Sequence, residues 1–128
     1  MSGIPAGKPG TVVLVVEDEP LLRMLAVEVV EEAGFIAIEA RDADEAVLLL
    51  ESRTDIALLF TDINMPGSMD GLKLAHAVRD RWPPIKILVV SGKQQPRSSD
   101  LPSNSCFLGK PYQAAALVEE LRSMVGSP

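Results

Sequence analysis

The chain has 128 residues, a formal net charge of -6 and an isoelectric point near 4.7. That length suits one domain, which at this size can bury roughly two-thirds of its unfolded surface. The twelve basic residues are scattered along the sequence, so the basic stripe of a direct nucleic-acid binder is absent. Uninterrupted apolar stretches fall far short of the roughly 20 residues of a membrane span, so we expect no membrane contact.

The N-terminal segment and the cysteine content bear on location. Residues 1–10 contain three glycines and two prolines, and we expect them to be a flexible leader. They lack the basic and apolar segments of a secretion signal. Cys106 is the only cysteine, which excludes an intramolecular disulfide and a multi-cysteine metal site. We therefore expect a cytoplasmic protein.

From residue 11 onward, short apolar runs alternate with stretches of helical period. This alternation is typical of βα units around a parallel sheet that is buried on both faces. The apolar runs predict five strands, at residues 12–16, 35–39, 56–61, 85–90 and 106–108.

Four of the stretches outside the strands predict helices, the last of them after the fifth strand. Pro20 suits the first turn of the first helix, and Gly34 suits the left-handed position that ends it. Asp42, with Glu45 three residues later, resembles a capping box at the start of the second helix. Two prolines at 83–84 prevent the third helix from continuing.

The segment between Ser91 and Cys106 interrupts the alternation. It holds two prolines and a single large aliphatic residue, Leu101. Such a segment buries too little apolar surface to form a packed amphipathic helix. We therefore expect the fourth helix of a regular βα alternation to be short or absent, and a mobile loop in its place.

Three residues that often carry chemistry have simpler interpretations here. His76 lies among polar neighbours in the third predicted helix, which favours a solvated surface residue over a ligand. Trp82 precedes two prolines and is expected to anchor the end of that helix. Cys106 falls in the fifth predicted strand and is expected to pack as a small apolar residue.

Four of the predicted strands lead directly into polar residues that phosphoryl-transfer chemistry uses. These are Glu17 with Asp18, Asp62, Ser91 and Lys110. If the strands are parallel, their carboxyl ends lie on one edge of the sheet, where α/β folds form their binding crevice. Three carboxylates, one hydroxyl and one amine would then share a pocket.

The charges of this group point to a metal ion. Carboxylates about 4 Å apart repel by roughly 4 kcal/mol per pair at an effective dielectric near 20. Either one of Glu17, Asp18 and Asp62 stays protonated or cations compensate, and Lys110 supplies only one positive charge. A divalent ion closes the deficit, and Mg²⁺ is favoured because the candidate ligands are hard oxygens.

The motifs around these residues resemble those of the response-regulator receiver domain of two-component signalling. They are Glu17-Asp18, Thr61-Asp62-Ile63-Asn64-Met65-Pro66, Met69-Asp70-Gly71-Leu72, Ser91-Gly92 and Lys110-Pro111. The motifs at Thr61 and Met69 form one group, so four groups follow predicted strands in the family's order, which makes the resemblance specific. It implies a receiver domain over residues 11–126, with a flavodoxin-like doubly wound sheet of five parallel strands in the order 2-1-3-4-5.

The resemblance also implies which residues form the magnesium and phosphoryl sites. Asp62 would be the phosphoacceptor, and Lys110 would contact the phosphoryl group. Mg²⁺ would bind Asp18, Asp62 and the backbone carbonyl of Asn64. Glu17, where aspartate is commoner in the family, would act largely through water.

Three further residues take roles from the same resemblance. Ser91 would be the switch hydroxyl. Phe107 would take the aromatic switch position three residues before the lysine, although tyrosine is more frequent there. The peptide bond before Pro111 would be cis, as it is in the family.

The function implied is a phosphorylation-dependent switch that changes affinity for an output protein whose identity is unknown. A histidine kinase or a histidine phosphotransfer protein would donate the phosphoryl group. The domain would catalyse only its own phosphorylation and dephosphorylation, so it would not be an enzyme in the ordinary sense.

Two alternatives use the same fold class. A haloacid-dehalogenase-type phosphohydrolase also combines an aspartate nucleophile, Mg²⁺, a hydroxyl and a lysine. Its Asp-x-Asp motif is missing, because the first strand is followed by Glu17-Asp18-Glu19, and no room is left for a substrate-selecting cap. A receiver-like binding module that signals without phosphate is the other alternative, and intact Asp62 and Lys110 argue against it.

Overall fold

The computed structural model describes residues 10–65, 69–92 and 96–125. Along the described chain lie five strands, four α-helices and one 3₁₀ helix. In chain order they are β1 (Val12–Val16), α1 (Pro20–Glu32), β2 (Ile36–Ala40), α2 (Ala43–Ser52), β3 (Ile56–Asp62), α3 (Gly71–Arg81), β4 (Lys86–Ser91), η1 (Ser98–Asp100), β5 (Ser105–Gly109) and α4 (Ala114–Met124). Of the expected leader, only Gly10 lies within the described residues.

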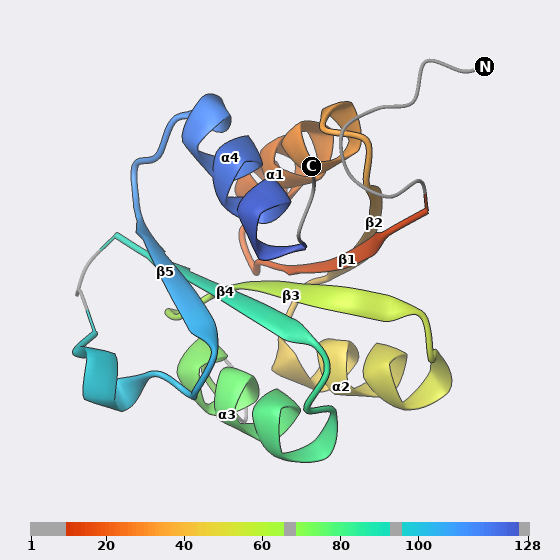
Figure 1. The fold of residues 1–128 in the computed structure, drawn as a ribbon, viewed down its shortest axis with the longest axis vertical. Coiled ribbons are helices and arrows are strands. Elements are labelled where there is room, and N and C mark those ends of the chain that lie inside the picture. The colour runs from red at the N-terminus through yellow and green to blue at the C-terminus, as the bar shows by residue number, and fades with distance from the viewer. Residues whose placement is uncertain (1–9, 66–68, 93–95, 126–128) are drawn as a thin grey trace.

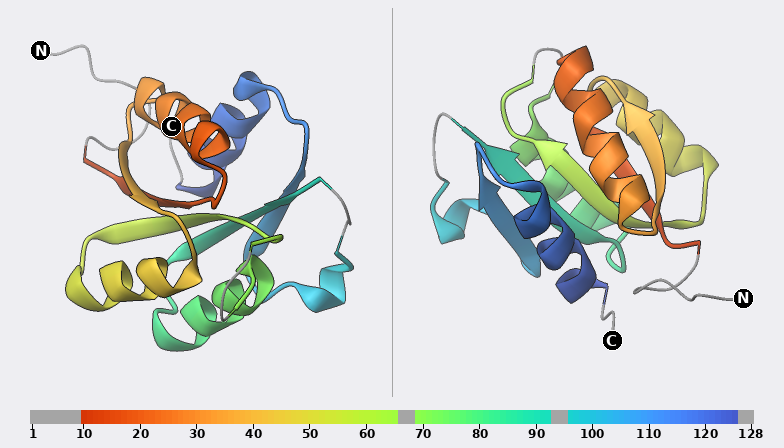
Figure 2. Two further views of the ribbon diagram at one scale, coloured as in Figure 1. Left: turned by 180° about the vertical axis from the view of Figure 1, so that it is seen from behind. Right: turned by 90° about the horizontal axis from the view of Figure 1, so that it is seen from above.

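All five strands belong to one parallel sheet, in the order β2-β1-β3-β4-β5. The strand order predicted from the sequence is therefore confirmed. Helices α1 and α4 cover one face of the sheet, and α2 and α3 cover the other (Figures 1 and 2). This layering explains why β1 is buried along its whole length and reads as a continuous apolar run.

Alternate strand residues form two cores, one on each face of the sheet. On the α2 and α3 face, Leu14, Leu59 and Ile87 pack with Leu74 and other residues. On the α1 and α4 face, the core consists of Val13, Val15, Ala26, Val30, Ala33, Phe35, Leu58, Phe60, Leu88, Val90, Leu117 and Leu121. Both cores lie under the strand ends and hold them in fixed positions.

The end of α1 explains why β2 begins one residue later than predicted. Gly34 has a φ of +99°, which suits a residue without a Cβ. The amide of Gly34 donates to the carbonyl of Glu31, and that of Phe35 donates to Val30. Phe35 therefore completes the helix cap and packs in the core, and it does not belong to the strand.

Aspartate side chains begin the next two helices. Asp42 accepts a hydrogen bond from the amide of Glu45, as the sequence predicts, while the Glu45 carboxylate accepts from Arg41. Asp70 caps α3 in the same way by accepting from the amide of Lys73. The third helix ends at Arg81, directly before Trp82 and the two prolines.

Residues 97–104, here called the strap, take the place of a full helix between β4 and β5. They contain only the three-residue η1, so the short fourth helix is confirmed for the described part of this connection. Leu101 packs against the core of the α3 face, and Pro102 is buried. Leu101 and Pro102 are thus packed onto the domain, while most other strap residues are exposed. Residues 93–95 of the expected mobile loop lie outside the described residues, and its mobility stays a prediction.

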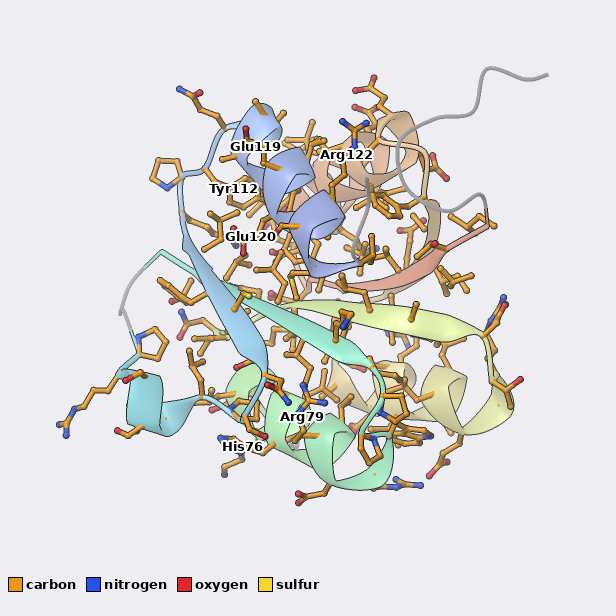
Figure 3. The ribbon with its side chains drawn as sticks, in the orientation of Figure 1. His76, Arg79, Tyr112, Glu119, Glu120 and Arg122 are labelled. Atoms are coloured by element: carbon orange, nitrogen blue, oxygen red, sulfur yellow. The ribbon has the colours of Figure 1, made fainter. Side chains whose placement is uncertain are left out.

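Two side chains of α3 hold the strap (Figure 3). The guanidinium of Arg79 donates to the carbonyls of Ser103 and Asn104, and also to those of Pro83 and Ile85, over distances of 2.6 to 3.0 Å. His76 Nε2 lies 2.7 Å from the carbonyl oxygen of Asp100. His76 is exposed, as expected, but it is hydrogen-bonded to the strap and not only to solvent.

Trp82 and Cys106 lie where the sequence places them. The Trp82 side chain packs against the core at the end of α3, and the Arg81 guanidinium carbon lies 4.3 Å from its ring centroid. Cys106 is a free cysteine in β5 and packs against the core of the α1 and α4 face. Burial, with the carboxylate of Glu120 nearby, raises the pKa of its thiol above the ordinary value.

Candidate functional site

The strand register brings the predicted site residues to one edge of the sheet. Val16, the last residue of β1, pairs with Thr61, and Asp62 of β3 pairs with Val90. Ser91 of β4 pairs with Gly109 of β5. Glu17 and Asp18 follow β1, and Lys110 follows β5. Since the strands end level with one another, these side chains enter a common pocket.

Lys110 links two of the carboxylates. Its Nζ lies 3.1 Å from Glu17 Oε1 and 3.4 Å from Asp62 Oδ1. The side chains of Glu17 and Asp62 are each only 8% exposed, so this ion-pair network is shielded from bulk solvent. The second oxygen of Glu17 accepts a hydrogen bond from the amide of Glu19. One ammonium group therefore serves two buried acids.

The third acid completes a cluster that suits a hard cation. Glu17, Asp18 and Asp62 each offer a carboxylate oxygen, and the three oxygens lie within 4.8 Å of one another. With Lys110 as their one ion-pair partner among the described residues, the cluster carries excess negative charge. All donors are oxygens, which is the ligand type that Mg²⁺ prefers. The residues present therefore fit the ion that the sequence predicts.

Burial shifts the titration of the acids in this pocket. It raises the pKa of the Asp62 carboxyl above its ordinary value, although Lys110 opposes the shift. The pKa of Glu17 is also raised by burial, against the hydrogen bonds from Glu19 and Lys110. Metal-free, both acids thus resist ionisation, as closely placed carboxylates should.

The pKa of Lys110 is raised as well, but for a different reason. Burial alone would lower the pKa of its ammonium group, but the hydrogen bond from Nζ to Glu17 and the charge of Asp62 outweigh this effect. The net result is a pKa above the ordinary lysine value. Lys110 therefore stays protonated at neutral pH and presents a fixed positive charge to whatever enters the pocket.

Ser91 and Asn64 form a hydrogen-bonded pair beside Asp62. The Asn64 side-chain amide donates to Ser91 Oγ across 3.2 Å. The Asn64 backbone amide also donates to the Asp62 carboxylate. Ser91 is buried, while Asn64 lies at the exposed surface of the pocket. Phe107 is half-buried and packs against the core of the α3 face.

Close backbone packing fixes the outline of the pocket. Any side chain at Gly71, the first residue of α3, would collide with the carbonyl oxygen of Asp62. A Cβ at Gly92 would lie 3.2 Å from the Cβ of Lys110. The peptide bond between Lys110 and Pro111 is cis. Glycine at position 71 therefore permits α3 to begin directly against the carboxyl end of β3.

Sequence reasoning missed the residues that flank the pocket. Arg23 of α1 donates to the carbonyl of Glu17 and pairs with Glu39 of β2, which ties the β1 end to its neighbours. A cavity of about 500 Å³ opens beside Glu17 and Lys110. Its walls are mostly apolar and consist of Leu22, Leu25, Ala26, Val29, Gly92, Pro111, Tyr112 and Ala114.

The N-terminal half of α1 carries four exposed apolar side chains. Leu21, Leu22, Met24 and Leu25 are between 44% and 56% exposed. An apolar stripe on the predicted helix fitted either burial or a docking surface. Only the folded arrangement shows that the N-terminal half of α1 projects beyond the core.

A doubly wound α/β fold with an acidic strand-end pocket, a lysine and a hydroxyl defines a class of phosphoryl-binding signalling domains. The family model of the response regulator receiver domain matches residues 13–122. The chain belongs to this family, whose members act as phosphorylation-dependent switches in two-component signalling. No match favours either alternative that we considered.

Relatives of known identity agree with this assignment. The response regulator receiver protein CpdR of Brucella abortus is 31% identical over 116 residues, which cover 88% of this chain and 95% of CpdR. The nitrogen assimilation regulatory protein NtrX of Azorhizobium caulinodans is 36% identical over 81 residues, 62% of this chain. The chain matches only 18% of the length of NtrX.

Solved structures show the same fold. A receiver protein from Sinorhizobium medicae superimposes with a TM-score of 0.86 at 24% identity, covering 91% of this chain and 95% of that one. Response regulator TrrA from Thermotoga maritima, in complex with Mg²⁺ and BeF, has a TM-score of 0.79 at 27% identity, with coverage of 89% and 98%. No helix in the described residues of this chain has both the length and the apolar character needed to cross a membrane.

Proposed function

We propose that Asp62 accepts a phosphoryl group from a phosphohistidine of a histidine kinase or a histidine phosphotransfer protein. The observation that carries the proposal is the pairing of buried Asp62 with Lys110 at 3.4 Å, at the edge where the strand ends meet. A carboxylate oxygen of Asp62 attacks phosphorus, and an O–P bond forms. The P–N bond to the donor histidine breaks, and its electron pair returns to the imidazole.

Lys110 supports this transfer with charge. Its ammonium group, held between Glu17 and Asp62, faces the position where a phosphoryl group on Asp62 would lie. A protonated lysine there neutralises the oxygens of the transferred group as negative charge gathers on them. The raised pKa of Lys110 ensures that the charge is present at neutral pH.

Mg²⁺ belongs to the same proposal. Asp18, Asp62 and the backbone carbonyl of Asn64 would hold the ion directly, and Glu17 would act through water. The support is the oxygen-only acidic cluster and the magnesium complex of TrrA. When bound, the ion would supply positive charge to the phosphoryl oxygens. The residues themselves keep the pocket small and shield it from bulk solvent.

The remaining residues turn phosphorylation into a signal. Ser91 would hydrogen-bond the phosphoryl group, and Phe107 would change its packing as Ser91 moves. Both residues lie on the last two strands of the sheet, next to Lys110. The output partner would read the resulting surface. Hydrolysis of the phosphoaspartate, which the domain would catalyse slowly, would end the signal.

The donor docks on α1. The four exposed apolar residues of α1 and the adjacent cavity form one surface, and the cavity reaches Glu17 and Lys110 at the pocket. A donor protein that covers this surface would bring its phosphohistidine to Asp62. A protein donor needs such a surface, whereas a small phosphodonor such as acetyl phosphate does not. A cytoplasmic location fits these donors and the free thiol of Cys106.

The proposal is tested by intact mass after incubation with acetyl phosphate and Mg²⁺. Wild type should gain one phosphoryl mass, and Asp62→Asn should gain none. Asp80→Asn, an exposed acid of α3, is the matched control and should label like wild type. Equal labelling of wild type and Asp62→Asn would refute the assignment of Asp62. Phosphoryl labelling that a chelator does not reduce would refute the proposed requirement for Mg²⁺.

A further inference from the structure

Asn64 contacts both of the groups on which the proposed switch depends. Its backbone amide donates to the Asp62 carboxylate, and its side-chain amide donates to the hydroxyl of Ser91. The two contacted residues come from neighbouring strands, β3 and β4. Asn64 therefore links the carboxyl ends of β3, which carries Asp62, and β4, which carries Ser91.

The backbone of Ser91 is fixed, so its side chain is the part that can respond. The carbonyl of Ser91 accepts from the amide of Lys110 at 2.9 Å, and the preceding carbonyl of Val90 accepts from Ile63 at 2.9 Å. Ser91 is only 3% exposed. A hydroxyl buried this deeply needs a hydrogen-bond partner, because leaving it unpaired is costly. Asn64 supplies that partner.

We propose that Asn64 is a positioning residue that holds the Ser91 hydroxyl in its resting orientation, and so biases the domain against the switched state. This inference rests on the proposed phosphorylation of Asp62. A phosphoryl oxygen on Asp62 would accept from the Ser91 hydroxyl, and to donate to it the Ser91 side chain must rotate away from the Asn64 amide that donates to its oxygen. Switching therefore breaks the bond between Asn64 and Ser91, and the free energy of that bond is subtracted from the free energy that favours the switched state.

The first test measures the affinity for beryllofluoride, a phosphoryl mimic, in the presence of Mg²⁺ by isothermal titration calorimetry. Asn64→Ala keeps the backbone amide and carbonyl but removes the side-chain amide. It should bind the mimic about fivefold more tightly than wild type, the equivalent of one neutral hydrogen bond of about 1 kcal/mol. In a Ser91→Ala background, the same substitution should change the affinity by less than about twofold.

Ser99→Ala provides the matched control for the loss of a serine hydroxyl, since Ser99 is an exposed residue of η1. It should leave both affinities unchanged. Weaker binding by Asn64→Ala would show that Asn64 supports the switched state, and would overturn the proposal. Tighter binding that persists in the Ser91→Ala background would also overturn it, because the effect would not pass through the hydroxyl.

A second readout needs neither metal nor mimic. In the metal-free protein, NMR should show a distinct side-chain amide signal for Asn64, shifted by its hydrogen bond to Ser91. Ser91→Ala should shift that signal, while Ser99→Ala should leave it in place. An Asn64 signal that does not change in Ser91→Ala would overturn the proposal that Asn64 holds the Ser91 hydroxyl. By contrast, failure of wild type to bind beryllofluoride at all would count against the proposed phosphoryl site itself.

Discussion

The two faces of the sheet, here called the α1 flank and the α3 flank, are built differently (Figure 1). On the α1 side, four large apolar side chains are about half exposed, beside a cavity that opens toward Lys110. On the α3 side, polar groups are joined to one another, because Arg79 and His76 bind backbone carbonyls of the strap. The α1 flank leaves apolar surface free for a partner, whereas the polar side chains of the α3 flank form hydrogen bonds within the domain.

This difference separates recognition from support. Apolar surface that remains exposed in a folded domain gains free energy when another protein covers it. A guanidinium whose donors already bind four carbonyls has little left to offer a partner, but it fixes the loops it joins. Substitutions on the α1 flank should therefore change transfer from a protein donor, and substitutions on the α3 flank should change stability.

The largest effect should come from Arg79→Ala. It leaves four backbone carbonyls without their shared donor, some of which water will satisfy, so we expect a loss of about 2 to 3 kcal/mol of unfolding free energy. Urea denaturation measures the loss. Arg81→Ala is the control, since it removes an exposed ion pair with Glu51 and the cation–π contact with Trp82, and should cost only about 1 kcal/mol. Equal losses in the two variants would mean that the strap is not held by Arg79.

Arg79→Lys sharpens the same prediction. Lysine keeps the positive charge but lacks the planar fork that reaches two loops at once, so most of the loss should remain. Labelling by acetyl phosphate should be unchanged in the folded variant, because Arg79 does not contact the pocket. Full recovery of stability in Arg79→Lys would show that charge, and not the geometry of the donors, holds the strap.

The second effect concerns the α1 flank. The double substitution Leu21→Ser and Leu25→Ser should slow transfer from a phosphorylated donor protein by about 30-fold, because about 2 kcal/mol of apolar burial is lost at the interface. Transfer from acetyl phosphate should change little. Leu48→Ser on α2, where the leucine is 65% exposed, is the matched control. Equal slowing by Leu48→Ser would remove the distinction between the flanks.

The acids of the strand-end pocket should make the stability of the protein depend on pH. Burial raises the folded-state pKa of Asp62 above its ordinary value, so the folded protein holds that proton more tightly than the unfolded chain does. Metal-free wild type should therefore lose stability as the pH rises from the ordinary carboxyl pKa through the raised folded pKa. Asp62→Asn should reduce this loss, with the share of Glu17 remaining because its pKa is also raised, and should be more stable at neutral pH by less than about 1 kcal/mol.

Thermal melts with a chelator at pH 4 to 8 measure this dependence. Asp80→Asn, on the surface of α3, should follow the wild-type curve. Mg²⁺ should stabilise wild type more than Asp62→Asn, because the cluster loses one of its three acids. A wild-type protein whose stability rises across the same pH interval would contradict the sign worked out here.

The sequence predicted most of this fold because buried parallel strands are continuous apolar runs. The strand order came from the family resemblance, and the pocket followed once the polar residues were placed at strand ends. Several strand boundaries differ by one residue; β2 starts late because Phe35 serves the cap of α1, which depends on hydrogen bonds of the backbone. Apolar periodicity cannot report such local competition.

The α3 flank could not be predicted in the same way. Arg79 reads as an ordinary surface residue, since its partners are backbone carbonyls that carry no sequence signal. Low apolar content therefore suggested a mobile loop between Ser91 and Cys106, without the hydrogen bonds from Arg79 and His76. The exposure of the apolar residues of α1 could not be predicted for another reason. An apolar stripe has the same sequence pattern whether it faces the core or a partner.

The smallest effect should come from His76. Its ring contacts the strap through one exposed hydrogen bond to Asp100, so His76→Ala should cost no more than about 0.5 to 1 kcal/mol. The loss should be local: amide hydrogen exchange should quicken within residues 98–104 and stay unchanged in α1. Lys73→Ala, an exposed neighbour on α3, should leave exchange in the strap unaltered. If His76→Ala left exchange in the strap at the wild-type rate, Arg79 alone would hold it, and the α3 flank would depend on a single side chain.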